Sequence, residues 1–120
     1  MKKLLGLLLI VITLSNFACA QNKKDTLFVA HWNLENLFDT IDDPKTDDEE
    51  FVIGSEKEWS ADRLDKKFYN LARVIRSMNN NNGPDVLGVC EVEHQDLLDS
   101  MLNKYLKDKF YRVGYLESQD

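Results

Sequence analysis

Two short apolar runs and one longer periodic stretch organise the middle of this chain. Residues 27–33 and 85–91 are rich in β-branched and other apolar residues, which predicts two strands. Between them, apolar residues recur at spacings of three and four from Leu64 to Met78. That spacing predicts an amphipathic helix, and Ser60 is a suitable N-cap for it. Strand, long connection with helix, and strand form a βαβ-like unit of the α/β class.

The same patterns predict a second helix and a third strand nearer the C-terminus. Apolar residues between 97 and 106 supply one face of a helix that follows His94, and residues 110–116 alternate as a strand does. The run at 85–91 is expected to be buried on both faces, with Cys90 as a small buried hydrophobe. Residues 40–58 sustain no period and are expected to form a solvated loop; their acidic residues lack the spacing of a calcium loop.

Polar side chains gather where the first two predicted strands end. Asn33 and Glu35 follow the first run, and Glu91 closes the second. Side chains alternate along a strand, so Asn33 and Glu35 should share one side while Leu34 turns into the core. In open α/β sheets ligands bind beyond the carboxyl ends of strands, which makes these ends the first candidate site. For Glu91, with Glu93 and His94 after it, the alternative is that they are solvated loop residues that precede the next helix. The basic residues of the predicted helix are interpreted as its wet face: Arg63, Lys66, Lys67, Arg73 and Arg76.

The first twenty residues have the pattern of a secretory signal. Lys2 and Lys3 precede an apolar run, and Ala18-Cys19-Ala20 offers small residues for cleavage before Gln21. The expected location is therefore secreted or periplasmic. Lipidation of Cys19 is the alternative, which would give a membrane-anchored lipoprotein. Either way the mature chain keeps one cysteine, so no disulfide framework is expected.

Composition and charge narrow the function further. The chain is 43% hydrophobic and 30% charged, which is ordinary for one globular domain. Its net charge is −6, and removal of the two signal lysines makes the mature chain more acidic. A broad basic face for nucleic acid is therefore not expected, whereas a site for a divalent cation is compatible with this charge.

Two motifs together resemble the start of the endonuclease/exonuclease/phosphatase, or DNase I-like, superfamily. They are WNLENLFD at residues 32–39 and PDVLGVCEV at residues 84–92, separated by the predicted helix. The resemblance extends from about Leu27 to Asp120. It implies an α/β fold (α+β in stricter terms): a four-layer sandwich of two mixed β-sheets flanked by helices. Residues 21–120 would form its N-terminal part.

The resemblance also implies roles for individual residues. Glu91 matches the glutamate that binds the catalytic magnesium, for which Mn²⁺ or Ca²⁺ are alternatives. Asn33 matches an asparagine close to the metal and the scissile phosphate, and Glu35 matches a more variable acidic position near the metal. Cys90 departs from the family pattern, in which glutamine usually stands there. Glu93 and His94 are interpreted as loop and helix-entry residues.

The implied activity is that of a metal-dependent phosphoesterase, with a secreted or periplasmic nuclease as the preferred class. A lipid or sugar phosphatase of the same superfamily is the first alternative, and a non-catalytic surface binding protein that keeps the fold is the second. Substrates would be phosphate esters, nucleic acid among them. Superfamily members also use later Asp-Asn and Asp-His segments, which residues 21–120 lack. We therefore expect these residues alone to be inactive.

The signal pattern predicts that export removes residues 1–20 and leaves Gln21 as the first residue. Intact mass and N-terminal sequencing of the exported protein measure this directly. A diacylated species beginning at Cys19 would contradict simple cleavage and establish the lipoprotein instead.

Overall fold

The computed structural model describes residues 26–44 and 49–117. Its elements, in chain order, are strand β1 (Val29–Leu37), 3-10 helix η1 (Glu49–Phe51), helix α2 (Ala61–Asn81), strand β2 (Val86–Val92), helix α3 (Gln95–Tyr105) and 3-10 helix η2 (Lys107–Lys109). The predicted signal segment 1–20, Cys19 included, lies outside the described residues. None of the helices within the described ranges is long and apolar enough to cross a membrane.

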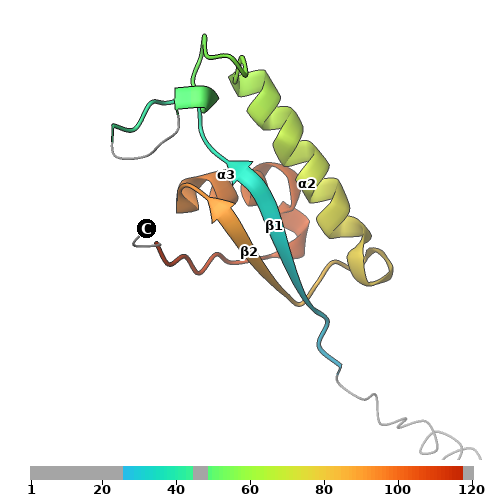
Figure 1. Ribbon diagram of the computed structural model, residues 1–120. Helices are drawn as coiled ribbons and strands as arrows, with labels where there is room; N and C mark the ends of the chain where they lie inside the picture. The colour runs from blue at the N-terminus through green and yellow to red at the C-terminus, as the bar shows by residue number, and fades with distance from the viewer. Residues whose placement is uncertain (1–25, 45–48, 118–120) are drawn as a thin grey trace, which may run out of the picture.

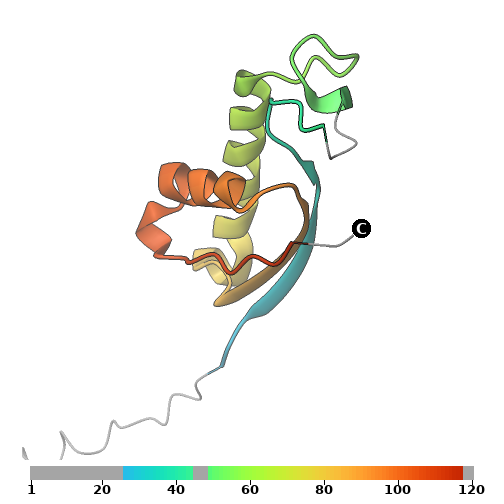
Figure 2. The same cartoon turned by 90° about the vertical axis from the view of Figure 1, so that its left-hand side faces the viewer.

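The two strands form a parallel pair connected through α2 (Figure 1). Asn33 lies opposite Cys90, and Leu37 lies opposite Val92 after an irregularity in the register. Both α2 and α3 lie on one face of this pair (Figure 2). The predicted strand–helix–strand unit is therefore confirmed, with β1 running four residues further than the apolar run had indicated.

The core lies between the covered face of the sheet and the two helices. Leu34 is 2% exposed and Leu37 is fully buried, so the predicted inward turn of Leu34 is confirmed. The helices meet these leucines with their apolar faces, through Phe68, Leu71, Ala72, Ile75, Leu97, Leu98, Met101 and Leu106. Full burial of one leucine side chain contributes roughly 1.5–3 kcal/mol, so this cluster is the main force that holds β1 against α2.

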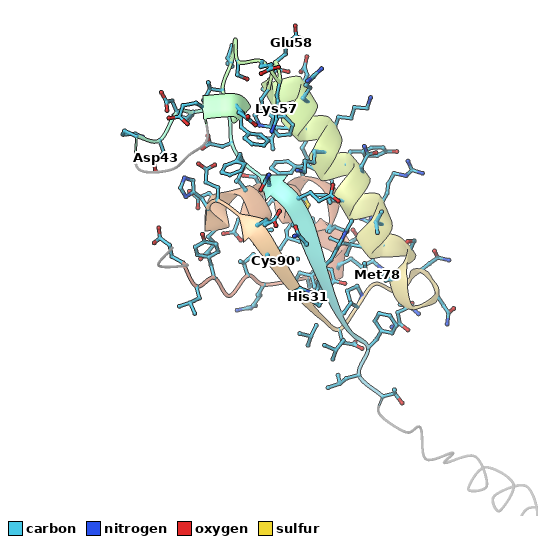
Figure 3. The ribbon with its side chains drawn as sticks, in the orientation of Figure 1. His31, Asp43, Lys57, Glu58, Met78 and Cys90 are labelled. Carbon is cyan, nitrogen blue, oxygen red and sulfur yellow. The ribbon has the colours of Figure 1, made fainter. Side chains whose placement is uncertain are left out.

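The opposite face of the sheet is bare within the described residues, and two expectations about β2 are therefore wrong. Cys90 is an exposed free cysteine, not a buried hydrophobe. Exposed and half-buried positions alternate from Val86 to Cys90, so β2 is covered on one face and not on both. In Figure 3 the bare face is turned toward the viewer, with Cys90 and His31 labelled on it. An apolar run shows that a strand can be buried, but not which elements will cover it.

The predicted third strand is also wrong. Residues 110–117 form no ladder and run as an extended segment. The Tyr111 hydroxyl donates to the Pro84 carbonyl at 2.7 Å, and the Tyr115 hydroxyl donates to the Glu93 carbonyl at 2.7 Å. A cavity of about 1280 Å³ lies between this segment and β2. The segment is thus held by tyrosine side chains instead of backbone pairing.

Both ends of α2 follow from local chemistry. At its start the Ser60 hydroxyl accepts the Arg63 backbone N–H at 3.4 Å, as expected for an N-cap. Regular helix geometry ends at Met78, where ψ is 158°, close to the predicted end. The chain then turns through Gly83, whose φ is +80° and whose added Cβ would lie 2.5 Å from the Tyr111 hydroxyl. Glycine is the residue that this turn requires.

Two of the five basic residues on α2 are not simply solvated. Lys67 and Arg76 are half-buried, whereas Arg63, Lys66 and Arg73 are exposed. The Arg76 guanidinium forms an ion pair with Asp108 and donates to the Tyr105 carbonyl at 2.7 Å. Its hydrogen bonds to Asp108 lower the pKa of that carboxyl from 3.8 to about 2.

This ion pair predicts how stability depends on pH. Because the pKa of Asp108 is lower in the folded protein, the pair stabilises the fold above pH 3.8. That contribution is lost as the pH falls toward about 2. Asp108→Asn should therefore lower the free energy of unfolding at neutral pH, and the difference from wild type should shrink as the pH falls through this window. Urea unfolding across a pH series measures it, with exposed Asp42→Asn as the matched control. A difference that stays constant with pH would contradict the assignment.

Candidate functional site: the carboxyl ends of two parallel strands

The ends of β1 and β2 bring Asn33 and Glu91 into direct contact. The Asn33 side-chain amide donates to Glu91 Oε1 at 2.6 Å, and the Asn36 backbone N–H donates to Glu91 Oε2 at 3.2 Å. The side-chain oxygen Oδ1 of Asn33 in turn accepts the Glu35 backbone N–H at 2.7 Å. Both carboxylate oxygens of Glu91 are therefore held in place while the side chain remains exposed.

The backbone around this contact is strained. Glu35, Asn36 and Glu91 have φ values of 55°, 58° and 58°, in the left-handed region that non-glycine residues seldom adopt. The first two fall at the register irregularity between Asn33 and Leu37. They form a bulge that turns Asn33 and the Asn36 amide toward Glu91 and still returns Leu37 to the core. Such conformations cost about 1–3 kcal/mol each and gather at functional sites.

Lys67 reaches this bulge from α2. Its Nζ donates to the carbonyl of Glu35 at 2.6 Å and to that of Asn36 at 3.0 Å. Burial lowers the pKa of the Lys67 ammonium, while the nearby Glu35 and Glu91 carboxylates act in the opposite direction. The interpretation of Lys67 as part of a wet face is therefore wrong.

The sequence held a signal for Lys67. It lies three residues after Leu64 and four before Leu71, so it shares the face of the apolar stripe. A lysine on that face must extend its ammonium past the core toward polar partners. Which partners it would meet could not be read from α2 alone.

The structure brings together Asn33, Glu35 and Glu91, the three residues selected from the sequence, but they do not all take part through their side chains. Asn33 and Glu91 contact each other through their side chains. Glu35 takes part through its backbone, as donor to Asn33 and acceptor from Lys67. Asn33 presents its amide nitrogen to Glu91, so it orients the carboxylate.

A second polar cluster lies beside the start of α3. Carboxylate oxygens of Asp39 and Glu93 and an imidazole nitrogen of His94 all lie within 4.8 Å of one another. The Asp39 backbone N–H donates to Glu93 Oε2 at 2.8 Å, and His94 Nε2 lies 3.6 Å from Glu93 Oε1. His94 is the N-cap residue of α3, which confirms it as a helix-entry residue. This cluster connects the end of β1 to the start of α3.

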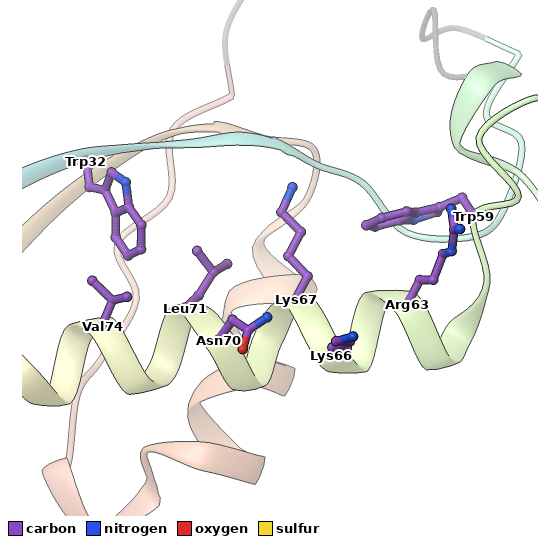
Figure 4. A pocket seen from close by; sticks show the side chains of 8 residues that line it. All are labelled: Trp32, Trp59, Arg63, Lys66, Lys67, Asn70, Leu71 and Val74. Atoms are coloured by element: carbon purple, nitrogen blue, oxygen red, sulfur yellow. The ribbon is translucent and has the colours of Figure 1, made fainter.

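A groove of about 430 Å³ runs between β1 and α2. Figure 4 shows Lys67 rising from α2 between Trp32 and Trp59. The Lys67 Nζ lies 5.6 Å from the Trp59 ring centroid, and the Trp59 indole N–H donates to the Phe38 carbonyl at 3.2 Å. Lys67 on α2 and Trp59 just before α2 line the groove and also hold the chain at the end of β1.

A glutamate held by an asparagine at the ends of parallel strands defines an α/β protein with a carboxylate–amide site. The chain matches the model of the Endonuclease/Exonuclease/phosphatase family over residues 28–120. It belongs to that family, and the match corresponds to the N-terminal portion of the superfamily. No curated protein and no solved structure matches the chain. Family membership places the chain in a superfamily of phosphoesterase- and nuclease-type hydrolases.

Proposed function

We propose that this chain is the metal-binding N-terminal part of an exported, Mg²⁺-dependent phosphoesterase, with nuclease activity as the first substrate class to test. The observation that carries the proposal is the Glu91 carboxylate, held at both oxygens by Asn33 and Asn36. The complete domain would be the four-layer sandwich implied by the family. Export is supported by the signal pattern of residues 1–20.

The donor set around Glu91 fits a hard divalent cation. Magnesium prefers oxygen ligands and commonly takes only one or two protein carboxylates, with water and substrate phosphate completing its shell. A carboxylate has about four lone-pair directions, and two of those at Glu91 are used by the hydrogen bonds to Asn33 and Asn36. The exposed side of Glu91 therefore retains capacity for an ion, and we propose Glu35 as the second acidic residue near it.

Each residue has a distinct part in this proposal. Glu91 binds the ion, Asn33 fixes the orientation of its carboxylate, and Glu35 adds negative charge nearby. Bound Mg²⁺ supplies Lewis-acid stabilisation of charge on the phosphoryl and leaving oxygens. Activation of the attacking water requires a correctly positioned general base. That part of the chemistry is proposed to come from later segments of the domain.

In the protein that carries the whole domain, Glu91→Gln should abolish magnesium-dependent phosphoester hydrolysis because the amide keeps the size and removes the charge. Asn33→Ala should cause a smaller loss, about 10–100-fold, as expected for a residue that orients a ligand. Double-stranded DNA, a generic phosphodiester and a phosphomonoester serve as substrates across a magnesium titration. Exposed Glu56→Gln is the control. Near wild-type turnover of Glu91→Gln would refute the proposal, and preference for the monoester would identify a phosphatase.

Residues 21–120 expressed alone should be catalytically inert and poorly folded. They lack the later Asp-Asn and Asp-His segments to which the family resemblance assigns water activation, and one face of their sheet is bare in the described residues. Solubility, thermal unfolding and phosphodiester hydrolysis test this. A soluble, cooperatively unfolding and active fragment would contradict it.

A further inference from the structure

We infer that Lys67 is a positioning residue for the proposed metal site: its ammonium holds the bulge at Glu35 and Asn36 in the conformation that keeps two donors on Glu91. The inference rests on the proposed function, because it assigns Glu91 as the ligand. It adds to the site a residue of α2. That residue lies outside both of the sequence motifs at the strand ends.

The backbone conformation of the bulge needs contacts from outside the bulge to stabilise it. Glu35 and Asn36 are consecutive left-handed residues, and neither is a glycine. Both are exposed, so burial of their own side chains does not hold them there. A strained backbone of this kind persists only where surrounding contacts over-determine it. The neighbouring leucines, Leu34 and Leu37, fix the two ends of the bulge through the core but not the peptide groups between them.

Lys67 supplies these stabilising contacts. An ammonium has three donors, and Lys67 directs two of them at the carbonyls of the two left-handed residues, at 2.6 and 3.0 Å. Trp59, just before α2, holds the next part of the chain in the same way, because its indole N–H donates to the Phe38 carbonyl. Three carbonyls of one short segment are therefore fixed from one side.

These contacts are directly connected to Glu91. The Glu35 carbonyl, which accepts from Lys67 at 2.6 Å, belongs to the same planar peptide group as the Asn36 N–H, and that N–H donates to Glu91 Oε2. The preceding peptide group supplies the Glu35 N–H, which donates to the side-chain oxygen Oδ1 of Asn33 and leaves the Asn33 amide directed at Glu91 Oε1. Release of the two carbonyls would let both peptide groups rotate. Glu91 would then lose the Asn36 donor, and the relaxed bulge would no longer fix the Glu35 N–H that orients the Asn33 amide.

A direct phosphate-binding role explains the geometry less well. Two of the three Lys67 donors already point at backbone carbonyls, and Lys67 is half-buried. The adjacent Lys66 is exposed and lines the same groove. Lys66 therefore provides a matched control on the same helix, with the same charge and without the contacts to the bulge.

The test measures binding of Mn²⁺ alone by electron paramagnetic resonance, in the protein that carries the whole domain. Lys67→Met should weaken binding by about 10–100-fold, the usual effect of losing a group that orients a metal ligand. Lys66→Met should leave the affinity unchanged. Lys67→Arg, which keeps a donor for each carbonyl, should retain most of it. Thermal unfolding of each variant is measured in parallel, because a purely structural role would lower the melting temperature and leave the affinity of the folded molecules unchanged.

Glu91→Gln separates this inference from the proposed function. Unchanged Mn²⁺ affinity in Glu91→Gln would refute the proposed function itself. If Glu91→Gln weakens binding and Lys67→Met does not, the positioning role of Lys67 alone is refuted. Should Lys67→Met not fold, Lys67→Gln takes its place, since its neutral amide can still donate to one carbonyl. About tenfold weaker binding is then expected, and wild-type affinity would overturn the inference.

Discussion

Parallel pairing of β1 with β2 is the constraint from which the site follows. The register sets Asn33 opposite Cys90, so the next residue of β2, Glu91, comes within 2.6 Å of the Asn33 amide. Burial of Leu34 and Leu37 against the helices fixes that register. A slip of one residue would turn both leucines to the bare face. The contact that defines the site and the contacts that hold the core are therefore consequences of one alignment.

The candidate site also departs from regular strand geometry at the bulge of Glu35 and Asn36. An uninterrupted β1 would continue its alternation past Asn33 and would not turn the Asn36 N–H toward Glu91. The bulge achieves this with two left-handed residues, at a conformational cost of about 1–3 kcal/mol each. Lys67 holds both of its carbonyls, and Trp59 holds the carbonyl of Phe38 just beyond it. Local irregularity at a site, supported from a neighbouring helix, is the arrangement expected where function overrides local preference.

Hydrophobic pattern predicted the parts of this structure that depend on local periodicity. The apolar stripe of α2, its N-cap Ser60 and the inward turn of Leu34 all follow from spacing alone. The burial of Cys90 was predicted wrongly, because an apolar run does not show which elements cover each face. The segment 110–117 alternates like a strand but has no paired neighbour in the described residues. The bulge and its hydrogen bonds to Lys67 depend on contacts between residues far apart in the sequence. The pattern of a single stretch does not predict such contacts.

Anomalous diffraction from crystals of the whole domain grown with Mn²⁺ would locate the ion directly. If Glu91 is the ligand, the anomalous peak lies within coordination distance of its carboxylate, and Asn33 remains hydrogen-bonded to the same group. A peak at the Asp39–Glu93–His94 cluster, with none at Glu91, would contradict the assignment of the metal site to the ends of β1 and β2.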